Sequence, residues 1–269
     1  MAAKPKLGQN FLRDPQAIQR IIAALGPLES RTVVEIGPGK GAITEGLAAR
    51  AKQLITIELD RELAWNLQER FSPEKGIHNV IVRRQDVLEF DLAAAAKDAG
   101  ESLLVVGNLP YYITSDILLH LFAAAVEGKL RRAVLMMQRE VGERVAASPG
   151  VRDYGLLSAT AQMNARVETL FTLAPEAFSP PPGVFSTVLR LEFAPRFGEL
   201  GVDAAGFDAF LKRCFAQKRK TLANNLRAAG WAGEELRAAW PASVPPQARA
   251  ESLALEPLAE LYRALGPRI

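Results

Sequence analysis

The stretch Thr32-Val-Val-Glu-Ile-Gly-Pro-Gly-Lys-Gly-Ala42 decides the fold class. Its first five residues form a mostly apolar run with the length of a buried strand, and three glycines follow within the next five positions. Glycine lets the backbone turn sharply and lets a ligand approach the chain with no side chain in between. We expect a helix to begin near Ala42, so the stretch predicts a strand, a ligand-binding turn and a helix in succession.

Strand-like runs recur on both sides of this stretch and indicate an α/β fold. A first helix is marked by Asp14 as N-cap and Pro15 at its first position. Further β-rich runs at 54–58, 79–82, 103–107 and 133–138 are separated by segments of helix length, which is typical of βαβ units in a mostly parallel sheet. Two more runs, 167–172 and 188–193, follow without a long helix between them and predict a hairpin at the sheet edge.

Composition fits two domains in a soluble protein. The chain has 269 residues, 49% of them hydrophobic, which is enough for one large and one small core. After Pro195 only helical patterns remain, so we place one domain at 1–195 and a helical domain at 196–269. No run of about 18 apolar residues and no secretory signal is found, and we expect a cytoplasmic monomer without a membrane partner. Cys214 is the single cysteine, and with two histidines it forms no zinc-type pattern, so we expect no metal.

Two acidic residues at strand ends point to a nucleoside ligand. Glu58 ends the second strand, 21 positions after Gly37, where a carboxylate can accept both hydroxyls of a ribose. Asp86 follows the third strand and could accept the adenine amine of S-adenosylmethionine, although a helix N-cap explains it equally well. Because Gly37, Gly39 and Ala42 also fit the G-x-G-x-x-G/A pattern, the loop by itself leaves NAD open, as well as a tight turn that binds nothing.

The fourth strand ends in Asn108-Leu-Pro-Tyr111, which suits chemistry on an adenine amine. That amine is a poor nucleophile because its lone pair is delocalised into the ring. The Asn108 side-chain oxygen and the Leu109 carbonyl can each accept one N–H and so direct the lone pair toward a methyl group. Pro110 fixes the bend, and Tyr111 offers a ring on which a flipped-out base can stack. An ordinary Pro-Tyr turn at a strand end is the alternative interpretation.

The excess positive charge lies in the C-terminal part of the chain. Residues 196–269 hold 11 of the 33 basic residues and 8 of the 30 acidic ones. Within nine positions stand the five residues of a basic run, Lys212, Arg213, Lys218, Arg219 and Lys220. This run is interrupted by Phe215 and predicts a surface that binds RNA phosphates, with a solvated helix face as the alternative.

Four further segments carry a family resemblance. They are Lys6-Leu-Gly-Gln-Asn-Phe-Leu12, Met137-Gln-Arg-Glu-Val141 with Tyr154-Gly-Leu-Leu-Ser158, Phe178-Ser-Pro-Pro-Pro-Gly-Val184, and Phe215-Ala-Gln-Lys-Arg-Lys-Thr-Leu-Ala-Asn-Asn-Leu226. With these segments the chain resembles the small-subunit ribosomal RNA adenine N6-dimethyltransferases over nearly its whole length. Small departures are Tyr112, where many members have Asn, and Lys218 and Ala223, which replace common arginines.

The resemblance implies a Rossmann-like methyltransferase fold, with a mostly parallel seven-stranded sheet and a small all-helical C-terminal domain. It implies S-adenosylmethionine as cofactor and, as substrate, two adjacent adenines near the 3′ end of small-subunit rRNA, dimethylated within a pre-ribosomal particle. It also implies that Phe178 closes over the target base opposite Tyr111. The implied cofactor pocket consists of Asn10, Leu12, Gly37, Glu58, Asp86 and Asn108.

Three alternatives remain at this point. A large-subunit rRNA adenine methyltransferase of the macrolide-resistance type shares the fold and cofactor, but usually has fewer prolines after its phenylalanine and lacks the Tyr-Gly-Leu-Leu-Ser segment. A non-catalytic ribosome assembly factor would not require the intact segment from Asn108 to Tyr111. An NAD oxidoreductase would need a proton donor, and neither His78 nor His120 stands near the expected cleft.

Overall fold

The computed structural model describes residues 9–266, which divide into two compact units. The first unit comprises the chain up to residue 142 together with Glu168–Phe193, and the second comprises Glu143–Val167 and the chain from Ala194 onward. The second stretch of the first unit therefore ends two residues before the boundary expected at 195. A single boundary does not describe the segment Glu143–Val167, which lies in the N-terminal part of the sequence but belongs to the second unit.

The first unit is built on a seven-stranded sheet with the order β4-β3-β2-β5-β6-β9-β7. The pairs β2–β3, β2–β5, β3–β4 and β5–β6 are parallel, whereas β9 runs antiparallel to β6. This confirms the expected Rossmann-like fold, with the two late strands adjacent at one edge. The strands are β2 (Thr32–Ile36), β3 (Gln53–Glu58), β4 (Val80–Arg84), β5 (Leu103–Asn108), β6 (Leu130–Gln138), β7 (Ala165–Leu173) and β9 (Ser186–Phe193).

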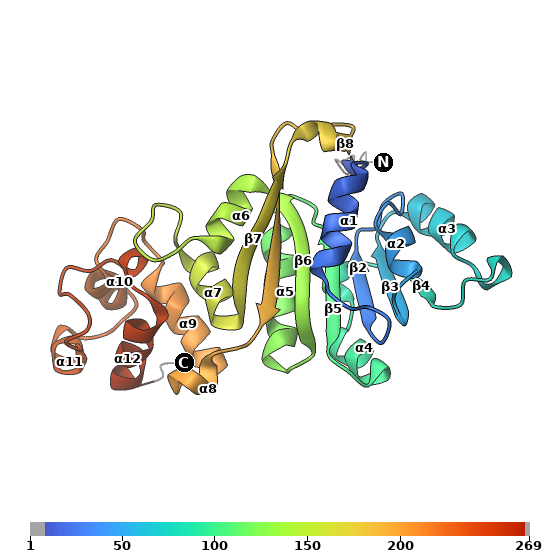
Figure 1. Cartoon of the computed structure of the whole chain (residues 1–269). Coiled ribbons are helices and arrows are strands. Elements are labelled where there is room, and N and C mark those ends of the chain that lie inside the picture. Colours follow the sequence, from blue (N-terminus) through green and yellow to red (C-terminus); the bar gives the residue numbers. More distant parts are fainter. Residues whose placement is uncertain (1–8, 267–269) are drawn as a thin grey trace, which may run out of the picture. The chain divides into compact units, whose positions relative to one another are not determined.

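Helices cover both faces of this sheet (Figure 1). On one face, Ile21 and Ile22 of α1 belong to the same hydrophobic cluster as Leu104 of β5 and Val134 of β6. Their strand neighbours point to the opposite face, where α5 packs against β6. The helices that begin in this unit are α1 (Pro15–Ala24), α2 (Thr44–Ala48), α3 (Arg61–Arg70), α4 (Leu92–Ala99), α5 (Thr114–Val126) and α6 (Arg139–Ala146).

The start of α1 follows from its sequence. Asp14 Oδ1 accepts hydrogen bonds from the backbone N–H groups of Gln16 and Ala17, at 2.8 and 3.2 Å. Two of the otherwise unpaired amides of the first turn are thereby satisfied. Pro15 occupies the first helical position, as predicted.

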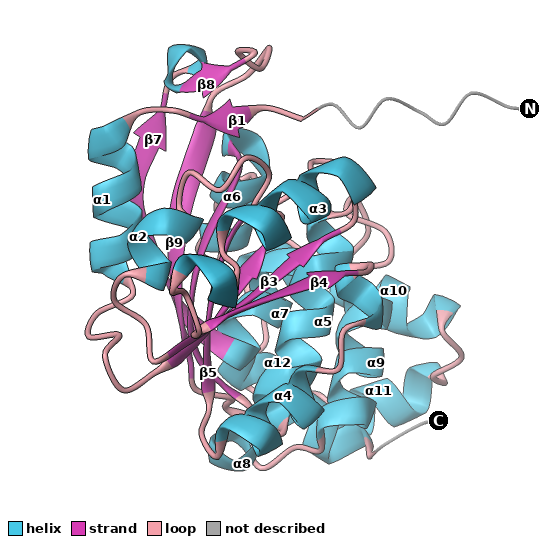
Figure 2. Cartoon of the chain, turned by 90° about the vertical axis from the view of Figure 1, so that its right-hand side faces the viewer, coloured by secondary structure: helices cyan, strands magenta, loops and turns pink. Residues whose placement is uncertain are grey.

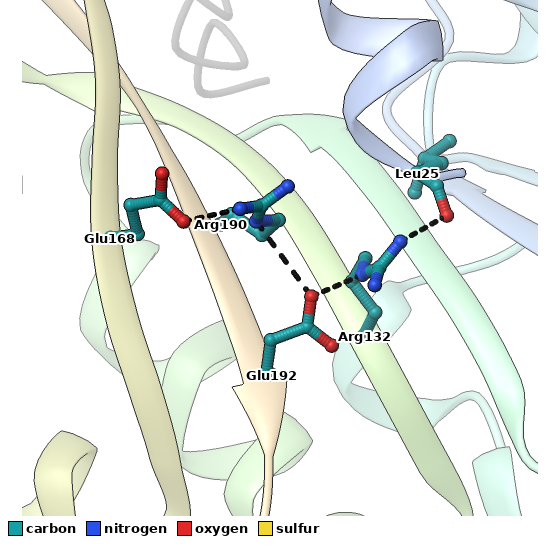
Figure 3. Close-up of polar contacts among 5 residues, drawn as sticks. All are labelled: Leu25, Arg132, Glu168, Arg190 and Glu192. Carbon is teal, nitrogen blue, oxygen red and sulfur yellow. Dashed lines mark hydrogen bonds and ion pairs between the residues drawn. The ribbon is translucent and has the colours of Figure 1, made fainter.

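A chain of ion pairs ties the antiparallel end of the sheet to α1 (Figure 3). Arg132 on β6 pairs with Glu192 on β9, and its guanidinium also donates to the Leu25 carbonyl at the end of α1, at 2.7 Å. Arg190 pairs with Glu168 on β7 and lies 3.7 Å from a Glu192 oxygen. The charges of three neighbouring strands therefore compensate one another where the sheet changes direction, and Arg132 links them to the end of α1.

A separate two-stranded sheet brings the start of the chain to a proline-rich segment. Strand β1 (Phe11–Leu12) pairs antiparallel with β8 (Phe178–Ser179), so that Leu12 stands opposite Phe178. The Arg13 N–H donates to the Ala177 carbonyl at 2.9 Å and extends this pairing. The two strands lie beside each other near the start of α1 (Figure 2).

The second unit is helical apart from the first residues of β7 (Figure 2). Its aromatic core joins Phe207 and Phe210 of α9 to Tyr262 of α12, with ring centroids 5.4 Å apart in each pair with Tyr262. Within residues 9–266 no helix is long and apolar enough to cross a membrane. The helices that lie wholly in this unit are α7 (Leu156–Asn164), α8 (Phe197–Leu200), α9 (Ala204–Cys214), α10 (Leu222–Ala228), α11 (Gly233–Ala239) and α12 (Leu255–Leu265).

Candidate active site

A cavity of about 320 Å³ opens at the carboxyl ends of β2, β3 and β5. This volume is typical of a small-molecule site, and the carboxyl edge is where open α/β sheets bind their ligands. All seven residues expected to bind the cofactor line this cavity: Asn10, Leu12, Gly37, Gly39, Glu58, Asp86 and Asn108. The next three residues after β5, Leu109, Pro110 and Tyr111, line it as well. Residues 6–8 of the opening segment lie outside the described residues.

The glycine loop forms a tight turn against the cavity. Gly37 and Gly39 have φ values of +63° and +57°, a conformation that other residues rarely adopt. A side chain at Gly39 would also place its Cβ 2.8 Å from the ring of Phe11. Helix α2 begins at Thr44, two residues after the expected start near Ala42, because the intervening residues continue the turn.

Glu58 is held at the end of β3 by backbone donors. One carboxylate oxygen accepts the Gly39 N–H at 3.0 Å, and the other accepts the Asp60 N–H at 2.9 Å. Burial raises the pKa of Glu58, and these two hydrogen bonds oppose that effect. Each carboxylate oxygen has a second lone pair, so both can still accept a hydroxyl from a ligand in the cavity.

Asp86 is a helix N-cap, one of the two interpretations that the sequence left open. Its Oδ1 accepts the Leu88 N–H at 2.9 Å and caps the short 3-10 helix Val87–Glu89. The residue also lines the cavity. The backbone contact fixes the carboxylate, and the second oxygen remains able to accept a hydrogen bond from a ligand.

Glu35 lines the same cavity and was not recognised from the sequence. Its side chain is 1% exposed, and Oε2 accepts the Thr44 hydroxyl at 2.7 Å. Burial raises the pKa of Glu35 to about 8; the hydrogen bond from Thr44 opposes this and the nearby Glu58 charge adds to it. A carboxylate inside an otherwise apolar buried strand was the available signal, because such a group is costly unless it serves a ligand or a partner.

Asn108 is oriented by the chain's first described segment. Its amide nitrogen donates to the Asn10 carbonyl at 3.0 Å, so the oxygen end of the side chain is the end left to accept an N–H. The turn after it is fixed by the Pro110 carbonyl, which accepts the Thr114 hydroxyl at 2.9 Å. Tyr111 lines the cavity, and its hydroxyl lies 3.1 Å from the Ser186 hydroxyl at the start of β9.

Phe178 does not line the cavity. Its side chain is 1% exposed and packs in the hydrophobic cluster that contains Leu12 and Val188. The pairing of β1 with β8 sets Phe178 opposite Leu12, and both side chains belong to this buried cluster. The expected closure of Phe178 over a base therefore requires the ring to leave the core.

The basic run lies in the second unit, on the last turn of α9 and the loop that precedes α10. Lys218, Arg219 and Lys220 are exposed on this loop, and the Lys218 ammonium donates to the Arg152 carbonyl at 2.6 Å. The Arg213 guanidinium lies 5.4 Å from the centre of the Trp231 ring. In the described part of the chain, no group of three or more His, Cys, Asp or Glu side chains could hold a metal ion.

The family model described as ribosomal RNA adenine dimethylase matches residues 1–265. The chain belongs to this family. One curated relative is the ribosomal RNA small subunit methyltransferase A of Acidobacterium capsulatum, which is 60% identical over 98% of this chain and 92% of its own length. Among solved structures, a dimethyladenosine transferase from Plasmodium falciparum covers 96% of this chain and 98% of its own, with a TM-score of 0.77 and 23% identity.

Family membership confirms the resemblance and makes an NAD oxidoreductase untenable. The 23S rRNA methyltransferase ErmE is also similar, with a TM-score of 0.71 and 26% identity over 95% of this chain and 99% of its own. The fold alone does not separate small-subunit from large-subunit enzymes, because a 23S rRNA methyltransferase also resembles this chain. The match to a small-subunit methyltransferase at 60% identity favours the small-subunit interpretation.

Proposed function

We propose that this protein is an S-adenosylmethionine-dependent methyltransferase that dimethylates the N6 amines of two adjacent adenines near the 3′ end of small-subunit rRNA, in a pre-ribosomal particle. The observation that carries the proposal is the orientation of Asn108. Its amide oxygen is directed away from the Asn10 carbonyl, in the wall of a cavity at the carboxyl edge of the sheet. Family membership supports adenine as the target, and the name of the relative supports the small subunit.

The charge of the cavity fits S-adenosylmethionine better than NAD. Its lining contains two acidic side chains, Glu58 and Asp86, and one basic residue, Lys40, while the buried carboxyl group of Glu35 keeps its proton up to a pH of about 8. This set suits a ligand that carries positive charge, whereas the pyrophosphate of NAD is an anion. Glu58 would accept the ribose hydroxyls, and Asp86 the adenine amine. When bound, S-adenosylmethionine supplies the methyl group.

At the target adenine, the chain's own groups act by orientation. In the first transfer the Asn108 oxygen and the Leu109 carbonyl accept the two N–H bonds of the amine, so that its lone pair faces the cavity. In the second transfer the monomethylated amine has one N–H left, which one of these two acceptors holds. After each transfer the nitrogen releases one proton to water. No strong base is needed, because the N–H bonds are polarised by neutral acceptors. Tyr111 stacks on the base, and its ring is held by the hydrogen bond to Ser186.

RNA affinity in this proposal comes largely from the second unit. The loop with Arg219 and Lys220 is shaped by Asn225, whose side-chain nitrogen donates to the carbonyls of Cys214 and Gln217 at 2.8 and 3.2 Å. Asn225 is buried, so the loop has a fixed backbone on which exposed cations stand. Phosphate groups of the particle would be the partners of these cations.

The variant Asn108→Ala tests the active site. Unmethylated small-subunit particles are incubated with saturating S-adenosylmethionine, since Asn108 borders the cofactor cavity, and the rRNA is analysed by mass spectrometry. Loss of one positioned hydrogen bond should lower the rate about a hundredfold or more, by analogy with an oxyanion-hole donor. The exposed Asn66 on α3 provides the control Asn66→Ala, which should keep the wild-type rate.

Three outcomes would contradict the proposal. A wild-type rate in Asn108→Ala would show that the active site lies elsewhere. Methylation of large-subunit rRNA by the wild-type protein, with small-subunit rRNA left unmodified, would favour the macrolide-resistance type of enzyme. Absence of any methylation despite tight cofactor binding would favour a non-catalytic assembly factor.

A further inference from the structure

Exposed apolar side chains gather at the carboxyl edge of the sheet. Among residues 9–266, half of the large exposed apolar side chains stand after β3, after β5 or before β9: Leu59, Tyr112, Val184 and Phe185. Single exposed apolar residues are ordinary, but a gathering of them beside a ligand site marks a binding surface. The proposed reaction uses none of Tyr112, Val184 and Phe185.

The hydrogen bond between Tyr111 and Ser186 joins two of these segments. Tyr112 follows Tyr111 directly, and Phe185 directly precedes Ser186, so one exposed ring stands on each side of the joined pair. Tyr112 is 64% exposed and Phe185 is 43% exposed. Tyr112 lines the mouth of the cavity and Phe185 does not, which places the second ring outside the cofactor site.

A cation accompanies the second ring. The Arg139 guanidinium lies 5.1 Å from the centre of the Phe185 ring, within the range of a cation–π interaction. The Arg139 N–H also donates to the Phe185 carbonyl at 2.9 Å, so the backbones of both residues are fixed. Aromatic faces next to basic groups are the combination with which proteins bind single-stranded nucleic acid.

The spacing of the strands sets the distance to the reacting amine. Asn108 ends β5, its register partner Met136 lies on β6, and Ser186 stands opposite Gln138 on the next strand, β9. Met136 stands opposite Val188 on β9, three residues from Phe185. Neighbouring strands are about 4.8 Å apart and each residue advances about 3.3 Å along a strand, so Phe185 stands roughly 14 Å from Asn108. A nucleotide bound there would be a near neighbour of the target in the same strand.

We propose that Tyr112, Phe185 and Arg139 form a second RNA subsite, which binds the nucleotide flanking the target adenine by stacking and by contact with its phosphate. This inference rests on the proposed function, since it requires an RNA strand at the Asn108 edge. Holding the neighbouring base keeps the strand in place while the target base leaves its stack. The same surface would receive the first adenine of the pair while the second is in the active site.

The test compares variants of Phe185, which lies outside the cofactor cavity. Methylation of unmethylated small-subunit particles is measured at saturating S-adenosylmethionine, and KM for particles is separated from kcat. Phe185→Ala should raise KM about 5- to 150-fold, the loss expected for stacking on one base. Phe185→Trp should restore the wild-type KM, whereas Phe185→Leu should not. Trp65→Ala is the matched control, because Trp65 is an exposed aromatic residue on α3 and should leave KM unchanged.

A second measurement reports on the cation. Arg139→Gln should reduce the slope of log KM against log salt by about 0.7, the value for one phosphate contact on a single strand. Calorimetry with S-adenosylmethionine should give the wild-type affinity for the Phe185 and Arg139 variants and thereby show that they are folded.

Several results would overturn the inference. An unchanged KM in Phe185→Ala, in an assay where the wild-type protein methylates its particles, refutes the subsite and leaves the proposed function intact. Rescue by Leu as well as by Trp would show an apolar contact to a ribosomal protein and not base stacking. An equal rise of KM in Trp65→Ala would show a non-specific effect. If the wild-type protein binds S-adenosylmethionine but methylates no RNA, the proposed function and the subsite both fail.

Discussion

Replacement of Glu35 by glutamine should change how the stability of the first unit depends on pH. The carboxyl group is buried beneath the cofactor cavity and keeps its proton up to a pH of about 8, because burial raises its pKa from 4.5. Its acceptor contact to the Thr44 hydroxyl survives in Glu35→Gln, since the amide oxygen accepts the same hydrogen bond. Glutamine therefore mimics the protonated acid and cannot ionise.

The direction of the pH dependence of the unfolding free energy follows from the raised pKa of Glu35. Below a pH of about 4.5 the group is protonated in both the folded and the unfolded chain, and it contributes no pH dependence. Between 4.5 and about 8 the unfolded chain loses this proton while the folded chain keeps it, so the free energy of unfolding falls as pH rises. The fall is about 1.4 kcal/mol per pH unit, or roughly 4 to 5 kcal/mol over the whole interval.

Urea unfolding of both proteins at pH 5, 6.5 and 8 measures this contribution. Subtracting the wild-type curve from the variant curve cancels the titration of other carboxyl groups, including Glu58. At pH 5 the difference in unfolding free energy should be small, and at pH 8 the variant should be more stable by several kcal/mol, with unchanged m-values. A difference that stays flat from pH 5 to pH 8 would refute the assigned protonation of Glu35.

Three further predictions concern the cofactor site, the packing of α6 and the basic run. Glu58→Ala should weaken S-adenosylmethionine binding in calorimetry by roughly 1.5 to 3 kcal/mol, and unchanged affinity would exclude it as the ribose ligand. Gly142→Ala should lower the free energy of unfolding by about 1 to 3 kcal/mol in a thermal melt, because the new Cβ would lie 2.0 Å from a methyl group of β9. The control Gly198→Ala should leave the melt unchanged, because its Cβ meets nothing within 4 Å. Arg219→Ala with Lys220→Ala should reduce the log-log salt slope of particle binding by about 0.7 to 0.9 per lost contact, with cofactor affinity unchanged; an unaltered slope would leave the run a solvated surface.

Much of the cofactor cavity could be predicted because its residues stand where parallel strands end. The glycine loop follows β2, Glu58 ends β3 and Asn108 ends β5, and paired parallel strands bring such ends to one edge. Sequence position therefore determines spatial proximity for these residues. Asn10 precedes the sheet and could be placed only by the family resemblance, since its hydrogen bond to Asn108 spans 98 positions.

The membership of Glu143–Val167 in the second unit could not be predicted from local patterns. Helix α7 has the composition of any buried helix, and its buried residues include polar ones such as Ser158 and Asn164. Its partners are distant in sequence: Met163 belongs to one hydrophobic cluster with Phe207 and Phe210 of α9. Hydrophobic periodicity shows that a face is buried but does not identify what covers it.

Phe178 packs in the hydrophobic core, although the family resemblance implies that it contacts the target base. In the structure its ring is buried opposite Leu12, which itself lines the cofactor cavity. Full burial of such a side chain is worth about 1.5 to 3 kcal/mol, and stacking on a base roughly 1 to 3 kcal/mol. The two energies are similar, so a base that enters beside Tyr111 can replace the core contact at small net cost. The closure over a base that the family resemblance implies would break the packing of Phe178 against Leu12 and Val188, so it would draw on the cluster that also holds Leu12 beside the cavity.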